Sequence, residues 1–263
     1  MQVPRISASS YSNTAPLIWS FLYGSERGRF ELILDNAPAR SAEMLRQKRA
    51  SAALVPVIEY QRIEDVLLIP RVCVGAKERV RSVCLVTKGV DLEDVKSVAL
   101  DVSSKTSVAL TKIIFREFYA LEPTYSEAKP NLTEMLSDSD CALLIGDPAL
   151  TVDDKIYRKF DLAETWKKFT NFGFVFAMWM VADEVPPPEQ IDFVAACEEG
   201  LASREQIIDF YQPRLGLSRQ ELHDYLHKNI SFSLDDELRA GLELYYQLAH
   251  KHGLIAALKP LNL

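Results

Sequence analysis

Phe174-Val175-Phe176-Ala177-Met178-Trp179-Met180-Val181-Ala182 is the longest continuous apolar run in the chain. It is far shorter than the roughly 20 residues that a membrane-spanning helix needs, so it predicts a buried strand. Working outward from it, short apolar runs of the same kind alternate with helical patterns toward the N-terminus. This alternation is typical of an α/β fold.

Two such segments followed by a helical tail predict a two-lobed molecule. We expect the first lobe to comprise residues 1–88 plus 183–263, and the second, inserted lobe to comprise residues 89–175. Two crossing strands, near 80–88 and 174–182, would join the lobes. A chain of this layout has a cleft between its lobes, and the loops at the strand ends face that cleft.

The tail changes character after Pro186-Pro187-Pro188 and reads as helical throughout. Ser203 with Gln206, and Ser218 with Glu221, both have the spacing of a capping box. A helical face ended by Gly253 follows, formed by Leu238, Leu242, Tyr245, Ala249 and His252. The sequence leaves two roles open for this tail: covering the first lobe or building a homodimer interface.

Composition and charge exclude several classes of protein. The net charge is -7 and no cluster of Lys and Arg stands out, so we expect no nucleic-acid partner. The N-terminus has no basic region followed by an apolar stretch, so we expect no signal peptide and a cytoplasmic location. The four cysteines form no CxxC pair, and we expect buried free thiols. They are Cys73, Cys84, Cys141 and Cys197.

Two polar loops after predicted strands open helices and carry hydroxyl, amide and small residues. Helix N-termini present free N–H groups and partial positive charge, so they bind carboxylates. Simple helix capping explains either loop alone, but two such loops facing one cleft favour a carboxylate ligand. The candidate residues are Ser9, Ser10, Asn13 and Thr14 in the first loop and Ser103, Ser104, Thr106 and Ser107 in the second.

Two further side chains stand near the predicted cleft. Ser82 lies in the apolar run Val80–Thr87, where the chain is about to cross between lobes, and is a candidate donor to the ligand. Asp147 follows a predicted buried strand within Gly146-Asp147-Pro148. It either forms an Asx-type turn or presents a strand-end carboxylate to the cleft.

Common cofactor and nucleophile motifs are absent: the chain has no GxxxxGK[ST], GxGxxG, HExxH or GxSxG pattern. All four histidines sit in the helical tail. His223 and His227 are four residues apart and could ligate a metal, but an amphipathic surface helix is favoured because no third ligand is nearby in the sequence. We therefore expect no metal, no cofactor and no covalent nucleophile.

The ordered motifs resemble the chorismate dehydratase family of menaquinone biosynthesis. The resemblance runs in the same order along residues 5–182 and departs from the family pattern in the turns at 76–79 and 170–173. It rests on Ser12-Asn13-Thr14-Ala15-Pro16-Leu17, Ala53–Tyr60, Val80-Arg81-Ser82-Val83-Cys84-Leu85, Asp101–Ser107, Leu144–Leu150 and Phe174–Trp179.

The resemblance implies a periplasmic-binding-protein-like type II fold and a hydro-lyase that converts chorismate to 3-[(1-carboxyvinyl)oxy]benzoate in the futalosine route. It also implies that Asn13 and Ser82 line the substrate site and that the loop 103–107 binds a carboxylate. The base that removes the proton is either the substrate's own enolpyruvyl carboxylate or Asp147. Two other functions stay open: the related 1,4-dihydroxy-6-naphthoate synthase, and a non-catalytic carboxylate-binding protein of a transporter or sensor.

Overall fold

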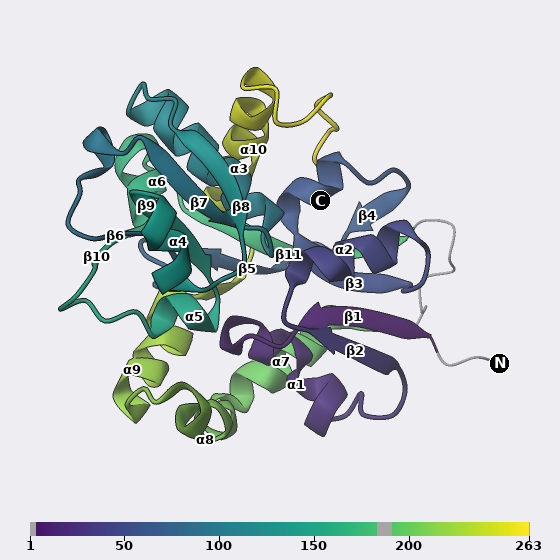
Figure 1. Cartoon of the computed structure of the whole chain (residues 1–263). Coiled ribbons are helices and arrows are strands. Elements are labelled where there is room, and N and C mark those ends of the chain that lie inside the picture. Colours follow the sequence, from purple (N-terminus) through teal and green to yellow (C-terminus); the bar gives the residue numbers. More distant parts are fainter. Residues whose placement is uncertain (1–3, 183–190, 263) are drawn as a thin grey trace.

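The computed structural model describes residues 4–182 and 191–262, and Figure 1 shows its two sheets with helices packed against each. The predicted lobe boundary at 183 and the run Pro186-Pro187-Pro188 lie outside the described residues. The mixed α/β architecture is as predicted, and it places a cleft between the two sheets.

The first sheet is built from both ends of the chain. In spatial order β12-β5-β11-β3-β1-β2 are neighbours, and β4 pairs with β11. The parallel β2-β1-β3 part belongs to βα units, whereas β11 runs antiparallel to β3 and returns the chain from the second sheet. The strands are β1 (Arg5–Ser9), β2 (Glu31–Asp35), β3 (Ala52–Pro56), β4 (Val66–Leu68), β5 (Val72–Ala76), β11 (Phe174–Ala182) and β12 (Ser231–Ser233).

The second sheet has the order β10-β6-β9-β7-β8 and comes from one continuous stretch of chain. Helices α4 and α6 pack against it, and α2 and α7 pack against the first sheet. Its strands are β6 (Val83–Thr87), β7 (Ser97–Asp101), β8 (Thr124–Ala128), β9 (Cys141–Ile145) and β10 (Arg158–Asp161).

The helices divide in the same way. Those of the N-terminal part and the tail are α1 (Ala15–Tyr23), α2 (Pro38–Arg46), α7 (Phe193–Ala202), α8 (Arg204–Leu215), α9 (Arg219–Asp224) and α10 (Asp236–Lys251). Those between β6 and β11 are α3 (Lys105–Ile113), α4 (Leu132–Asp138), α5 (Asp147–Leu150) and α6 (Leu162–Thr170). Short turns of other helix types are η1 (Ser12–Thr14), η2 (Val57–Gln61), η3 (Leu92–Asp94), η4 (Ile114–Phe118) and η5 (Tyr225–Asn229).

One boundary differs from the sequence-based expectation. The expected first lobe ends at residue 88, with a crossing strand near 80–88, whereas strand β6 pairs with β9 and β10 of the second sheet. The strand also begins at Val83, so Ser82 precedes it. The physical reason is that β6 is central in its sheet and buried on both faces, and its flanks gave no sign of which sheet it joins.

The chain crosses between the sheets twice, between β5 and β6 and again before β11. The outgoing segment, residues 77–82, is held by Asp161, whose carboxylate accepts hydrogen bonds from the backbone N–H groups of Val80, at 3.0 and 3.1 Å, and of Arg81. The same carboxylate caps α6 by accepting from Ala163 and Glu164. One buried acid therefore fixes both the crossing and the start of a helix, and burial raises its pKa.

Helix α10 packs across both parts of the molecule. Four residues of the predicted face, Leu238, Leu242, Tyr245 and Ala249, are buried, whereas His252 follows the last helical residue and is half-buried. The Tyr245 hydroxyl donates to the backbone oxygen of Thr106 on α3, and the Tyr246 hydroxyl donates to that of Val57 on η2. The tail thus covers the junction between the lobes, and β12 adds a short strand that the helical reading missed.

Two further expectations concern burial and length. All four cysteines are free and buried, as predicted. Among the described residues no helix is long and apolar enough to cross a membrane.

Candidate active site

Two cavities lie in the cleft, and Tyr11 lines both of them. The inner cavity has a volume of about 40 Å³ and the outer one about 900 Å³. Their walls come from both sheets: β1 and the loop after it on one side, and the loops after β7 and β9 on the other. This is the place where strand-end loops were expected to meet.

The inner cavity gathers half of the predicted site residues around one small space. Apolar side chains from β3, β5, β6 and β11 complete its wall. The predicted residues that line it are Ser9, Asn13, Thr14, Ser104 and Ser107.

The loop 103–107 forms the N-terminus of α3 at this cavity. Ser104 is the N-cap residue, and its hydroxyl accepts a hydrogen bond from the backbone N–H of Ser107 at 3.3 Å. The two hydroxyl oxygens are 3.0 Å apart. Capping and ligand binding are therefore compatible here, because Ser104 and Ser107 both line the cavity at this helix N-terminus.

Asn13 enters the cavity from the opposite side, on the turn η1 that precedes α1. Its Oδ1 atom is buried and has no hydrogen-bond partner, which leaves it open to a ligand. Thr14 is engaged within its own loop, since its hydroxyl donates to the backbone oxygens of Ser9 and Tyr11 at 2.8 Å. Thr14 thus stabilises the loop that presents Asn13.

Asp147 lies at the start of α5 and reaches across the cleft to Ser12. Its carboxylate accepts hydrogen bonds from the backbone N–H of Ser12, at 3.0 Å, and from the Ser12 hydroxyl. Burial raises the pKa of this carboxyl, and the bonds from Ser12 oppose that shift. Asp147 lines the outer cavity and not the inner one, so its described contacts join the two sides of the cleft.

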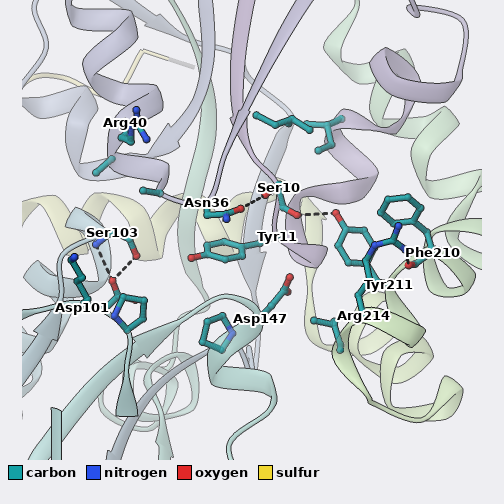
Figure 2. Close-up of a pocket in the computed structure, with 18 of the residues that line it drawn as sticks. Ser10, Tyr11, Asn36, Arg40, Asp101, Ser103, Asp147, Phe210, Tyr211 and Arg214 are labelled. Carbon is teal, nitrogen blue, oxygen red and sulfur yellow. Dashed lines mark hydrogen bonds between the residues drawn. The ribbon is translucent and has the colours of Figure 1, made fainter. Parts of the chain in front are cut away.

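The outer cavity is centred on Tyr11, with its hydroxyl end directed toward Asp101 and Ser103 (Figure 2). Asp101 accepts hydrogen bonds from the backbone N–H and hydroxyl of Ser103, at 2.9 and 2.6 Å, while its other oxygen is buried without a partner. Burial, with Asp101 close by, raises the pKa of Tyr11 to about 12, so the phenol stays protonated at neutral pH.

Ser10 and three cationic residues complete the rim of the outer cavity. The Ser10 hydroxyl donates to Asn36 Oδ1 at 2.6 Å, and its backbone oxygen accepts from the Tyr211 hydroxyl at 2.9 Å (Figure 2). The cations are Arg40, Lys129 and Arg214. Positive charge at the mouth of a cleft attracts anionic ligands even in a protein of net negative charge.

Ser82 and Thr106 line neither cavity. Ser82 is fully buried and its hydroxyl has no hydrogen-bond partner, although it lies near the Tyr225 hydroxyl and directly before Val83 of the inner wall. The Thr106 hydroxyl accepts a hydrogen bond from the backbone N–H of Ile58 at 3.2 Å, which links α3 to η2.

Sequence reasoning did not single out Tyr11 or Asp101. Asp101 is the first residue of a quoted motif, and Tyr11 directly precedes another, the motif that begins at Ser12. Asp101 ends strand β7, and a carboxylate at a strand end was the signal used for Asp147. Tyr11 gave no signal of its own, because an aromatic residue after a strand is usually part of a core.

A model of the menaquinone biosynthesis family matches residues 4–251. The chain belongs to this family. A curated relative, the chorismate dehydratase of Thermus thermophilus, is 31% identical over 255 residues, which cover 89% of this chain and 91% of that protein. The match of this menaquinone biosynthesis family member therefore extends over most of both proteins.

Solved structures agree on the fold of the family member. A protein from Archaeoglobus fulgidus superposes with a TM-score of 0.78 at 17% identity, covering 95% of this chain and 98% of that one. A Candida albicans protein described as having the generic periplasmic binding protein fold gives 0.69 at 10% identity, with 98% and 92% covered. The aliphatic sulphonate binding protein of Escherichia coli gives 0.64 at 17% identity, with 97% and 89% covered. The predicted periplasmic-binding-protein-like fold is therefore confirmed.

Proposed function

We propose that this protein dehydrates chorismate to 3-[(1-carboxyvinyl)oxy]benzoate and water, as a carbon–oxygen lyase of menaquinone biosynthesis. The observation that carries the proposal is the inner cavity, where Asn13 from one lobe faces Ser104 and Ser107 from the other. The curated relative named chorismate dehydratase supports it. Hydroxyl groups, an amide and a helix N-terminus suit a ligand with two carboxylates.

The described cavity is closed around a space too small for such a ligand. About 40 Å³ is well below the roughly 300 Å³ at which small-molecule sites begin. Hydrogen bonds across the cleft hold it shut: Ser12 to Asp147, and the backbone N–H of Ala39 to the oxygen of Ser103 at 3.1 Å. We infer that the lobes separate for chorismate to enter and close around it.

The reaction needs positioning and charge stabilisation above all. Removal of the C3 proton of chorismate leaves a carbanion delocalised through the ring diene into the ring carboxylate. Hydroxide then leaves C4, takes up a proton and departs as water, and the ring becomes aromatic. The enzyme's part is to orient the substrate and to stabilise the charge that develops on the ring carboxylate.

We assign roles to residues on this basis. The N-terminus of α3, with Ser104 and Ser107, binds one carboxylate, and Asn13 hydrogen-bonds another substrate oxygen. Ser82 has a free buried hydroxyl one residue from the wall and reaches the substrate once the cleft rearranges. Ser9, Ser10, Thr14, Ser103 and Thr106 shape and support these loops.

The proton acceptor is the substrate's own enolpyruvyl carboxylate in this proposal. Asp147 is the protein-based alternative, but its carboxylate is engaged by Ser12 and lines the outer cavity. An acid held in this way acts as a latch between the lobes. No histidine lies in the walls of either cavity, which leaves few other candidate bases among the described residues.

A turnover assay tests the proposal. Purified protein is incubated with chorismate alone, and products are separated by chromatography and followed by ultraviolet absorbance. Formation of the enolpyruvyl benzoate is expected, with a loss of about 100-fold in kcat/KM for Asn13→Ala and no change for Ser137→Ala on the exposed end of α4. Chorismate that survives unchanged with folded protein contradicts the proposal.

The remaining alternatives correspond to other outcomes of the same assay. Tight binding of chorismate or another dicarboxylate without conversion favours the carboxylate-binding protein, and conversion of a different substrate favours the related naphthoate synthase.

We also propose a cytoplasmic location, which cell fractionation tests, and a homodimer, which light scattering tests.

A further inference from the structure

Three side chains that bind metals well meet where α8, which lines the outer cavity, packs beside α9 and η5. His223 of α9 and His227 of η5 have stacked rings, with centroids 4.1 Å apart and planes at 13°. The sequence argued against a metal site here because it showed no third ligand. The structure supplies one: Glu205, near the start of α8, brings Oε1 to 4.0 Å from His227 Nε2. One ligand atom from each residue lies within 4.8 Å of the others.

We propose that Glu205, His223 and His227 bind a Zn²⁺ ion. Two imidazoles and one carboxylate form a donor set that zinc favours, with water as a fourth ligand in tetrahedral geometry. Zn–N and Zn–O distances of about 2.0–2.2 Å need ligand atoms roughly 3.3 Å apart. The present separations are slightly larger, and all three side chains are on the surface or half-buried, where rotamer changes are easy.

The state of the two imidazoles suits this role. Nδ1 of His223 is buried without a hydrogen bond, because the nearest carboxylate oxygen, Asp224 Oδ1, is 3.6 Å away. Of the nearby charges, Arg219 pairs with Asp209 and Lys228 with Asp224, and Arg204 adds one more positive charge beside His227.

One neighbour competes with the metal. Arg219 donates to Glu205 Oε2 at 2.5 Å and also pairs with Asp209. Zinc would take over a carboxylate that now belongs to an exposed ion pair, and such pairs contribute little stability. Bound zinc would tie α8 to α9 and η5. Because α8 presents Phe210, Tyr211 and Arg214 to the outer cavity, the ion would fix one wall of the cleft.

Calorimetric titration with ZnCl₂, and titration with Co²⁺ followed by its visible absorption bands, test this site. We expect one ion per chain in the wild type, with affinity reduced at least about tenfold in His223→Ala, His227→Ala and Glu205→Gln. His250→Ala, an exposed histidine on α10, is the matched control and should leave the affinity unchanged. The four buried thiols should not compete.

Two further measurements keep the test decisive. Arg219→Gln should tighten zinc binding by freeing Glu205, and zinc should raise the unfolding temperature of the wild type but not of a His223→Ala/His227→Ala double variant. Equal zinc affinity in the wild type and the double variant overturns the proposal. Wild-type affinity in Glu205→Gln overturns the three-ligand assignment.

Discussion

Asp101 shows at the residue scale how burial sets a pH dependence. Its carboxylate is buried with one oxygen unpartnered, and burial raises its pKa. An acid with a raised folded-state pKa binds its proton more tightly in the folded protein than in the unfolded chain. Below the unfolded-state pKa near 4, the carboxyl is protonated in both states and does not change the free energy of unfolding. As pH rises from there through the folded-state pKa, its ionisation lowers the free energy of unfolding.

Asp101→Asn removes this titration while keeping an oxygen that accepts from Ser103. We expect the variant's stability advantage over the wild type to grow as pH rises from about 4 and then to level off. Urea unfolding at a series of pH values from 4 to 8 measures it. An advantage that shrinks with rising pH would show that ionised Asp101 stabilises the fold instead.

Gly146 is required for two independent reasons. Its φ is +65° with ψ -148°, a region that is essentially open to glycine alone, and an added Cβ would lie 2.7 Å from the Tyr11 ring. Gly146→Ala should lose about 1–3 kcal/mol of stability from the backbone conformation, and should also displace Tyr11. Gly28→Ala is the control, because Gly28 has φ +79° and nothing within 4 Å of an added Cβ.

The two glycine variants are compared by thermal unfolding and by turnover. We expect both to be destabilised and only Gly146→Ala to lose activity beyond its loss of folded protein. Equal activity per folded molecule in both variants would argue against a role for the contact between Gly146 and Tyr11.

At the scale of single elements, two serines with the same capping-box spacing form different contacts at the starts of their helices. Ser218 and Glu221 form the predicted capping box of α9, with both reciprocal hydrogen bonds. Ser203 makes no side-chain cap for α8, and its hydroxyl donates back to the oxygen of Glu199. The reason is that α7 runs almost directly into α8, so Ser203 ends one helix as it starts the next.

Alanine at each serine should expose that difference. We expect Ser218→Ala to lower the free energy of unfolding by about 1 kcal/mol, because the backbone N–H of Glu221 loses its hydrogen-bond acceptor. We expect Ser203→Ala to lower it clearly less. Chemical denaturation of the two variants measures both values. Equal losses would mean that the Ser203 hydroxyl stabilises the α7–α8 junction as much as a cap does.

The sequence predicts the elements and the polar residues of the site better than it predicts their grouping. Ser9, Asn13, Ser104 and Ser107 could be found because polar residues at strand ends face a cleft in this class of fold. Tyr11 could not, because an aromatic side chain looks the same whether it fills a core or a cavity. Glu205 could not be found either, because it is far from His223 and His227 in the sequence and lies beside them only in the folded chain.

At the scale of the whole molecule, we propose that the contact between Ser12 and Asp147 breaks when the cleft opens and forms again when it closes. If Asp147 is a latch, Asp147→Ala removes both hydrogen bonds from Ser12, whereas Ser12→Ala removes the hydroxyl bond and keeps the backbone one, so the double variant should be little worse than Asp147→Ala. We expect each to raise KM by about tenfold with a smaller effect on kcat, since a hydrogen bond to a charged group is worth roughly 1.5–3 kcal/mol.

Asp147→Asn separates the latch from a catalytic base. An asparagine keeps an oxygen that accepts from Ser12, so a latch should work at a near-normal rate, whereas a general base replaced by an amide should lose about 10²–10⁴-fold in kcat. Steady-state kinetics with chorismate on the four variants and on Ser137→Ala decide the matter. Near-normal turnover in Asp147→Asn, together with coupled losses in the alanine variants, leaves the substrate's carboxylate as the base. Collapse of kcat in Asp147→Asn, with Ser12→Ala still active, makes Asp147 the base and removes the latch from the mechanism.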